Sequence, residues 1–425
     1  IFFSLLLINL FGVFMPELGF DALWYHLTLP KLYLQKHQWY FPGGLLYYSA
    51  MPRLMETLFI PLIHFTGSIG PKFVQFAAGL ISCLSIYKIL KQLTSDKLLP
   101  LIGVNLFYAT WLVSWQSSSA YIDLCRTMFE VTALMFLIQK RSVMSLIGGG
   151  LLLGLAIGTK WHALVSLLIF SLVFSPALLG IGLLVSLPWF LIAFHFTNNP
   201  FYPLFEPFMM ASQFSQTRFS IPFILPFDDF FSPAMGLVFL MSLPALFSRR
   251  KIVRQVTLVG ILGSIIASLT PPPSSRYFLP YLPSVIISCT YIISKLLPRY
   301  QKIMIILFTA SSIFILFLRL LSLAKFIPLL LGQSTNHYLA SISSRLPDTF
   351  IDSDNFVTEN LPSDSKILID KLHNLYYFPF NYDHTSWAKP GVKYDYLITV
   401  GDPVGQKDKQ LLHTNSLGIQ VFKLY

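Results

Sequence analysis

The sequence predicts an α-helical membrane protein of about eleven transmembrane helices with a small soluble α/β domain at its C-terminus. Of its 425 residues, 54% are hydrophobic and 12% are charged, which is more apolar surface than a water-soluble globule of this length buries. The apolar residues form long runs, and a run of roughly 17 to 25 residues crosses a bilayer. After residue 330 the apolar runs shorten to the length of strands.

Eleven apolar runs are long enough to be candidate spans. A further apolar segment, 56–65, contains a proline and is either a twelfth span or a helix in the membrane interface. The eleven candidates are 1–15, 71–90, 98–115, 121–139, 143–159, 162–176, 178–196, 231–248, 252–270, 277–296 and 301–321.

Clusters of Lys and Arg between these runs decide between the two alternatives. Such residues are retained on the cytoplasmic side, and all four clusters share one side only if 56–65 lies in the interface. We then expect 16–70 and 197–230 to be outer loops of a membrane domain over 1–330, and 331–425 to be an outer α/β domain. The four clusters are Lys88/Lys91/Lys97, Lys140/Arg141, Arg249/Arg250/Lys251/Arg254 and Lys295/Arg299/Lys302.

The tail contains three strand-like runs, separated by turn signals such as LPSD and GDPVG. They are KILID (366–370), YDYLITV (394–400) and GIQVFKLY (418–425).

Several function classes lose support from the same composition. The net charge of +11 is spread in short clusters between apolar runs, so we predict no nucleic-acid partner. The sequence has no GxxxxGK[ST] phosphate loop, no GxGxxG after a strand and no GxSxG elbow, which argues against nucleotide-driven transport and serine hydrolysis. The three cysteines lie in or beside apolar runs without metal-ligand spacing, and we expect packed thiols and no zinc site.

The first outer loop carries the residue with the clearest chemical use. Asp21 lies in FDALWYHLTLP, where a helix beginning nearby would place Tyr25 on the same face and His26 beside it. A carboxylate near the outer membrane surface could accept the proton of a nucleophilic hydroxyl. The alternative is that Asp21 caps the helix.

Three further charged residues lie on the predicted outer side. Asp123, in YIDLCRTMFE, is either a site residue or the partner of Arg126 one turn later. Lys160 follows GLAIGT against the positive-inside trend, and it either reaches for water or neutralises a phosphate. Arg276 follows a proline turn, and its guanidinium suits either a substrate phosphate or lipid headgroups.

The order of these motifs resembles the GT-C superfamily of polytopic glycosyltransferases, which includes protein O-mannosyltransferases and the aminoarabinose transferase of lipid A. The resemblance covers roughly residues 1–300. The matching segments are FDALWYH (20–26) with LPKLYL (29–34), YIDL (121–124), GLAIGTKW (154–161), NNPFYPLF (198–205) and SRYFLPYLP (275–283).

The resemblance implies an enzyme that moves a sugar from a polyprenyl-phosphate donor to a hydroxyl of a glycan, lipid or protein, with inversion. Asp21 would be the general base, and Asp123 a second catalytic residue that orients the base or the acceptor. Cations would neutralise the leaving phosphate. The expected substrate-binding residues are Tyr25, His26, Lys31, Lys160, Arg276 and Tyr277.

The resemblance also implies a place in the cell. Nucleotide sugars are absent outside the cytoplasm, so we expect a multi-pass protein of a bacterial inner membrane, embedded among membrane lipids, whose site faces the periplasm or exterior. Many relatives have an Asp-Glu pair where Asp21 is followed by Ala22, and we therefore predict no cofactor and no metal at this site. Two other classes stay open, a transporter or flippase of a lipid-linked saccharide and a non-catalytic envelope assembly factor.

Overall fold

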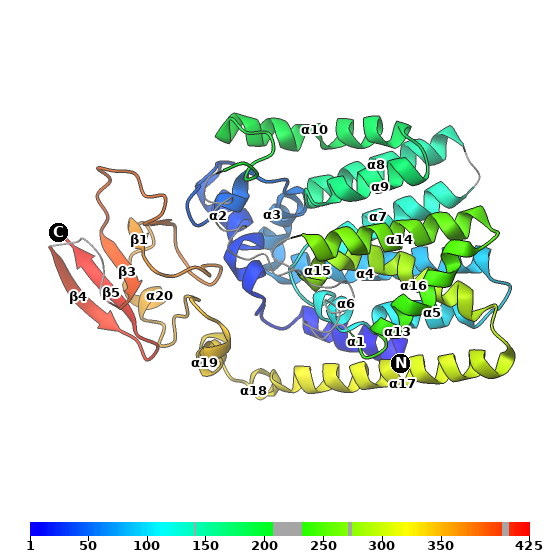
Figure 1. Cartoon of the computed structure of the whole chain (residues 1–425). Coiled ribbons are helices and arrows are strands. Elements are labelled where there is room, and N and C mark those ends of the chain that lie inside the picture. The colour runs from blue at the N-terminus through cyan, green and yellow to red at the C-terminus, as the bar shows by residue number, and fades with distance from the viewer. Residues whose placement is uncertain (140–141, 207–231, 271–273, 402–407) are drawn as a thin grey trace. The chain divides into compact units, whose positions relative to one another are not determined.

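The computed structural model describes residues 1–139, 142–206, 232–270, 274–401 and 408–425. The described chain divides into two compact units. The helical unit contains Ile1–Phe14, Met51–Met55 and Lys72–Leu323, and the loop-sheet unit contains Met15–Ala50, Glu56–Pro71 and Ala324–Tyr425. Figure 1 shows the elements of both units.

The helical unit is built almost entirely of helices that fall on the predicted spans. Three predicted spans are interrupted: 98–115 forms two helices, 231–248 ends in a 3-10 turn, and 277–296 contains one. The elements are α1 (Phe2–Val13), α4 (Ile69–Leu93), α5 (Leu99–Tyr108), α6 (Trp111–Gln116), α7 (Asp123–Ile138), α8 (Val143–Thr159), α9 (Ala163–Val173), α10 (Ala177–Thr197), α13 (Met235–Ser242), η3 (Leu243–Phe247), α14 (Lys251–Leu269), α15 (Ser275–Phe278), η4 (Leu279–Tyr281), α16 (Leu282–Ile293) and α17 (Pro298–Ala324).

Among the described residues, four helices are long and apolar enough to cross a membrane by themselves. They are α4, α10, α14 and α17, with 25, 21, 19 and 27 residues. The total of eleven spans stays a prediction. By contrast α3 (Leu54–Thr66), which covers the proline-containing segment, has only 13 residues. A helix of that length rises about 20 Å, short of the ~30 Å hydrocarbon core, and the choice between an interfacial helix and a twelfth span stays a prediction.

Glycines let α8 pack closely against α10. A Cβ atom at Gly154 would lie 2.5 Å from the Cβ of Val185, and one at Gly150 would lie 2.7 Å from the Cβ of Ile181. Small residues allow such close helix packing where the lipid supplies no hydrophobic drive. Figure 1 shows α8 beside α10. The packing fixes the end of α8, and therefore the place of Lys160, which follows it.

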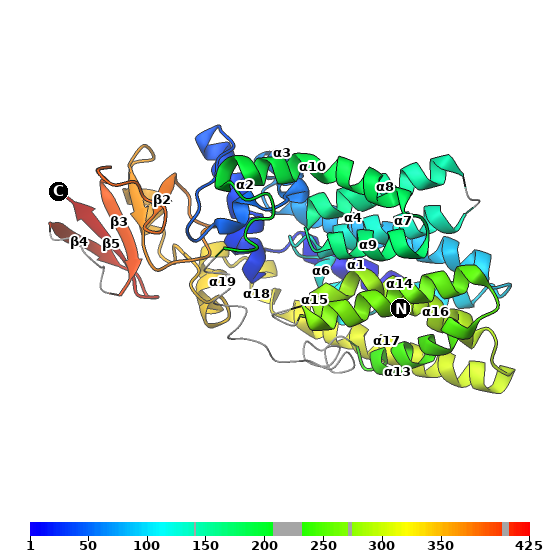
Figure 2. The same ribbon diagram turned by 45° about the horizontal axis from the view of Figure 1, so that its top comes forward.

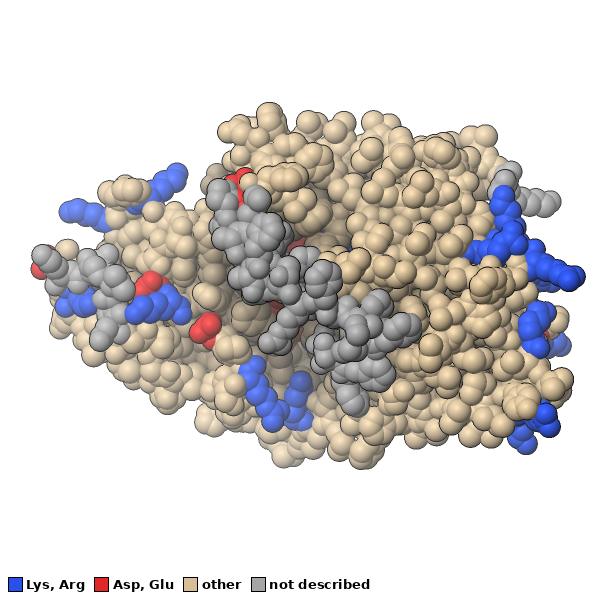
Figure 3. All heavy atoms as spheres, in the orientation of Figure 1, with Lys and Arg blue, Asp and Glu red and all other residues tan. Residues whose placement is uncertain are grey.

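Basic side chains gather at one end of the helical unit, as Figure 3 shows. The guanidinium of Arg250 donates to the carbonyl of Leu93 at 3.0 Å, which joins the start of α14 to the end of α4. The members of three predicted cytoplasmic clusters are all exposed, while Lys140/Arg141 lies outside the described residues. These three clusters therefore lie together at one end, and the location of that end in the cytoplasm stays a prediction.

The loop-sheet unit combines most of the predicted outer loop 16–70, called the first outer loop below, with the tail. Its helical elements are η1 (Ala22–His26), α2 (Thr28–Lys36), η2 (Tyr47–Ala50), most of α3, α18 (Ile327–Leu330), α19 (Thr335–Ser341), η5 (Ser343–Arg345) and α20 (Phe356–Asn360). Its strands are β1 (Ile367–Ile369), β2 (Tyr382–His384), β3 (Tyr396–Val400), β4 (Lys409–Thr414) and β5 (Ile419–Leu424).

These strands form one sheet in the order β2-β1-β3-β5-β4. β1 is parallel to β2 and β3, whereas β5 is antiparallel to β3 and β4. The three predicted strands are β1, β3 and β5, which carry the apolar runs. β2 and β4 were not predicted, because both are edge strands with polar sequences, YDH and KQLLHT (Figure 2).

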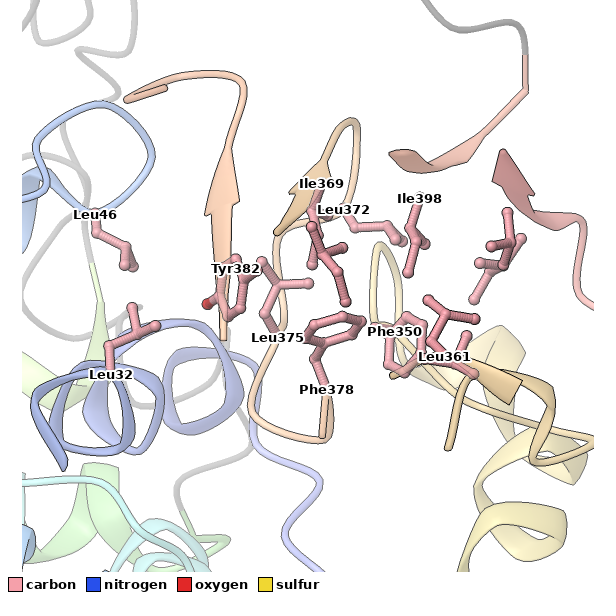
Figure 4. Packing of buried hydrophobic residues seen from close by; sticks show 14 of the residues in the cluster. Leu32, Leu46, Phe350, Leu361, Ile369, Leu372, Leu375, Phe378, Tyr382 and Ile398 are labelled. Carbon is pink, nitrogen blue, oxygen red and sulfur yellow. The ribbon is translucent and has the colours of Figure 1, made fainter. Parts of the chain in front are cut away.

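One hydrophobic core holds the loop and the sheet together. Leu32 of α2 and Leu46 of the loop are buried in the same cluster as Phe350, Phe378 and Ile369 of the tail (Figure 4). The first outer loop and the tail therefore fold as one unit. The predicted domain boundary at residue 330 stays a prediction.

Candidate functional site

A buried carboxylate and a cation form the centre of the candidate site in the helical unit. Asp123 is the first residue of α7, and its Oδ1 accepts a hydrogen bond from Lys160 Nζ at 2.7 Å. Its Oδ2 accepts from Gln116 Nε2 at 3.0 Å. The Asp123 side chain is 2% exposed and that of Lys160 is 15% exposed. Lys160 lies between α8 and α9, where burial lowers the pKa of its ammonium and the Asp123 carboxylate opposes that shift.

The third predicted charge, Arg276, lies in the same part of the helical unit. Ser274 caps α15 by accepting from the Arg276 N–H at 3.3 Å, which fixes the start of the helix. The guanidinium lies 5.2 Å from the ring centroid of Tyr121, two residues before Asp123. The charge of Arg276 also contributes to the lowered pKa of Lys160.

Two aromatic rings complete the surroundings of Lys160. Its Nζ lies 5.5 Å from the ring centroid of Tyr277, a favourable cation–π position. The His162 ring stacks on Tyr277, with centroids 4.8 Å apart and planes at 19°. The structure therefore brings together four of the predicted site residues, Asp123, Lys160, Arg276 and Tyr277.

This cluster has the chemistry of an anion site. Lys160 and Arg276 carry two positive charges against the single carboxylate of Asp123. Beside Lys160, the buried polar atoms Trp161 Nε1 and His162 Nδ1 have no hydrogen-bond partner within the described part of the chain. Buried polar groups are nearly always paired, so unpaired ones beside excess positive charge suit a bound polar ligand.

Arg126 was the alternative partner of Asp123, but the hydrogen bonds of the two side chains lead elsewhere. Arg126 Nε donates to Glu130 Oε1 at 2.7 Å, and Asp123 accepts from Lys160 and Gln116. Asp123 still acts on Arg126 through its charge. The two pairs separate because Lys160 approaches Asp123 from the end of α8, a contact that local spacing does not show. Glu130 and Gln116 were not singled out from the sequence, although a lone acid inside an apolar run is a signal that would have found Glu130.

Asp21 belongs to the loop-sheet unit and is half-buried. Tyr25 Oη donates to Asp21 Oδ2 at 3.3 Å, so these two side chains share a face as predicted. The capping alternative is wrong, because Asp21 precedes η1 in helical conformation and its side chain makes no capping hydrogen bond. The carboxylate is therefore not used in holding the start of this helix.

The other two predicted site residues of the loop have partners inside the loop-sheet unit. His26 is buried, and its Nδ1 lies 2.6 Å from Glu56 Oε1. Lys31 Nζ donates to the carbonyls of Tyr376 and Phe378 at 2.8 and 2.5 Å. Burial lowers the pKa of Lys31 to about 8. Both side chains therefore join parts of the unit to each other, and their substrate-binding roles stay predictions.

Tail residues also position the loop that carries Asp21. Tyr377 Oη donates to the carbonyl of Glu17 at 2.8 Å, and Lys36 Nζ lies 2.7 Å from Asp383 Oδ1. The rings of Trp24 and His373 are close to parallel, at 20° and 6.4 Å between centroids. Asp21 is therefore held by a loop whose conformation depends on the tail.

Solved structures match nearly the whole chain. ArnT from Cupriavidus metallidurans bound to undecaprenyl phosphate matches with a TM-score of 0.66 and 13% identity, over 98% of this chain and 96% of that chain. This chain has a GT-C-like fold. The apo state of that ArnT gives the same values, and an apo oligosaccharyltransferase from Archaeoglobus fulgidus matches with a TM-score of 0.46 and 11% identity, over 87% and 62%.

No family model and no curated protein sequence match the chain. The GT-C-like fold is therefore established by the comparison of structures alone. The predicted fold resemblance is confirmed. With its long apolar helices, the chain is an integral membrane protein.

Proposed function

We propose that this protein is an integral membrane glycosyltransferase that transfers a sugar from a polyprenyl phosphate to an acceptor hydroxyl. The carrying observation is the cluster of Lys160 and Arg276 around Asp123, whose excess positive charge suits a phosphate. The fold supports this proposal, because an ArnT of the same fold has been solved with undecaprenyl phosphate bound.

In the proposed reaction Asp21 accepts the proton of the acceptor hydroxyl. The oxygen then attacks the anomeric carbon, and the bond between that carbon and the phosphate oxygen breaks with inversion. One carboxylate suffices, because the leaving polyprenyl phosphate is already a stable anion and needs neutralisation more than a proton. Tyr25 orients Asp21 through its hydrogen bond.

Lys160 and Arg276 are the proposed partners of the leaving phosphate. Lys160 can exchange its Asp123 contact for a phosphate oxygen, and Asp123 then keeps the ammonium in place through the charge. The guanidinium of Arg276 offers two parallel donors to phosphate oxygens. Tyr277 holds the Lys160 ammonium over its ring in both states.

The proposed orientation places this chemistry outside the cytoplasm. The exposed basic clusters at one end of the helical unit would lie in the cytoplasm, and the tail in the periplasm or exterior. The donor must then be lipid-linked, because nucleotide sugars are not available there.

Mass spectrometry of lipid-linked sugars and envelope glycans tests the proposal. Cells that lack the gene should accumulate one polyprenyl-phosphate sugar and lose one glycan modification, and the intact gene should reverse both changes. An Asp21→Asn gene should reverse neither. Full reversal by Asp21→Asn would contradict the enzyme and favour a flippase or an assembly factor, since those functions need no general base.

A further inference from the structure

The helical unit contains a second charged cluster, further along α7 than the candidate anion site. Arg126 Nε donates to Glu130 Oε1 at 2.7 Å, and the two side chains are 2% and 1% exposed. Ser166 Oγ donates to Glu130 Oε2 at 2.7 Å and lies 2.9 Å from Tyr281 Oη. This Arg126 cluster joins α7, α9 and η4.

The two clusters repeat one arrangement. In the first, Lys160 Nζ lies 5.5 Å from the ring centroid of Tyr277, and in the second the Arg126 guanidinium lies 5.8 Å from that of Tyr281. In both, α7 supplies the carboxylate that pairs with the cation. The same three chain segments therefore build two successive layers.

The spacing of the layers differs between the segments. The carboxylates of Asp123 and Glu130 are seven residues apart on α7, about 10 Å along the axis. Two further pairs with corresponding places in the layers are four residues apart, roughly 6 to 8 Å, so the layers lie farther apart on α7 than on the other two segments. These pairs are His162 with Ser166, and Tyr277 with Tyr281.

The Arg126 cluster differs from the anion site in its charge balance and in the hydrogen bonds that its members make with each other. Its two charges cancel, both carboxylate oxygens of Glu130 accept a hydrogen bond, and the Arg126 guanidinium also lies within hydrogen-bond distance of Ser166 and Tyr281. Breaking such a buried pair leaves an uncompensated charge, so the pair resists any relative sliding of the segments.

We infer that Glu130 and Tyr281 are positioning residues for phosphate recognition. By holding Arg126 and Ser166, they keep α7, α9 and the 275–281 segment in register, and this register places Lys160 and Arg276. The inference rests on the proposed function. Buried ion pairs can contribute specificity of arrangement more than stability, and here the arrangement specified is that of the two phosphate-binding cations.

The test measures the Kd of the full chain for undecaprenyl phosphate and for undecaprenol, its uncharged alcohol. The Kd ratio is the Kd for undecaprenol divided by the Kd for undecaprenyl phosphate. This ratio isolates recognition of the phosphate, whereas a general loss of structure weakens the binding of both lipids. Tyr281→Phe removes one hydroxyl. The double variant Arg126→Met/Glu130→Met removes both charges, a change that often leaves stability intact. Thr257→Val is the control, because it removes a buried hydrogen bond of 2.9 Å to Ser288, between α14 and α16.

We expect both cluster variants to lower the Kd ratio about tenfold with the undecaprenol Kd unchanged, a loss typical of removing a supporting contact at metal sites. Thr257→Val should keep the wild-type ratio. A wild-type ratio in Tyr281→Phe and in the folded double variant would overturn the inference while leaving the proposed function intact. If the double variant does not fold, Tyr281→Phe decides alone. A Lys160→Met/Arg276→Met variant with the wild-type ratio would instead overturn the proposed function, and the inference with it.

Discussion

The two units of this protein hold their candidate residues by different physical means. In the helical unit, charged side chains pair with each other in buried positions, as Asp123 and Lys160 do. In the loop-sheet unit, Asp21 lies on a loop that is fixed mainly by a hydrophobic core shared with the tail. We propose a division of labour on this basis, in which the helical unit binds an anion and the loop-sheet unit presents a base.

Asp21→Asn should have the largest effect and tests the role of the loop-sheet unit. Loss of a general base typically slows transfer by about 10²- to 10⁴-fold. The measurement is turnover of the lipid-linked donor in reconstituted vesicles. Asp364→Asn is the matched control, because this exposed acid lies in the same unit. Equal turnover in the Asp21→Asn and Asp364→Asn variants would contradict the role of Asp21 as the base.

Lys160→Met should have the second largest effect, and it tests whether the helical unit binds the phosphate. It removes one cation and the hydrogen bond that this cation donates to the buried Asp123 carboxylate, so we expect undecaprenyl phosphate to bind roughly 10- to 100-fold more weakly. A double variant, Lys160→Met/Asp123→Asn, separates the two causes. If the double variant regains the wild-type Kd, the ammonium serves only to neutralise Asp123 and binds no phosphate.

The pH dependence of stability tests how fully the loop-sheet unit buries His384. Burial lowers the pKa of His384 to about 4, below its ordinary value of 6.5. Because the unfolded chain takes up a proton below pH 6.5 and the folded chain does not, stability falls as pH falls, until about pH 4. We expect a loss of about 2 kcal/mol of unfolding free energy between pH 7 and pH 5.

Thermal unfolding of wild type and His384→Asn at both pH values measures this loss. The difference between the two proteins should shrink or change sign toward pH 5, since only the wild type carries the protonation penalty. A difference that does not depend on pH would show that His384 titrates alike in both states.

Lys36→Met should have the smallest effect. The Lys36 and Asp383 side chains are 24% and 30% exposed, so water screens the pair. Its removal should cost under about 1 kcal/mol of stability and leave turnover near the wild-type value. A large loss of turnover at unchanged stability would show that this single contact, and not the shared core, positions the loop.

The two units also differ in how much of their structure the sequence predicts. The helices were predictable because each apolar run carries its own signal, and Asp123, Lys160 and Arg276 because charge is rare beside such runs. Their pairing was not, since Lys160 reaches Asp123 from the end of another helix. Local spacing offered Arg126 as an alternative partner.

In the loop-sheet unit the sequence shows still less. The contact of Leu32 with a core that contains Phe350 joins residues more than 300 positions apart, and no local pattern signals it. The donation of Lys31 to two tail carbonyls has the same origin. The edge strands β2 and β4 were missed because their side chains lack the apolar run that marks a buried strand.

The division of labour is tested most directly by the phosphate selectivity of Asp21→Asn. The measurement is the ratio of the Kd for undecaprenol to that for undecaprenyl phosphate, taken beside Lys160→Met/Arg276→Met. We predict that Asp21→Asn keeps the wild-type ratio while the double variant loses it. If Asp21→Asn lost the ratio as fully as the double variant, or the double variant kept it, phosphate binding would not belong to the helical unit alone.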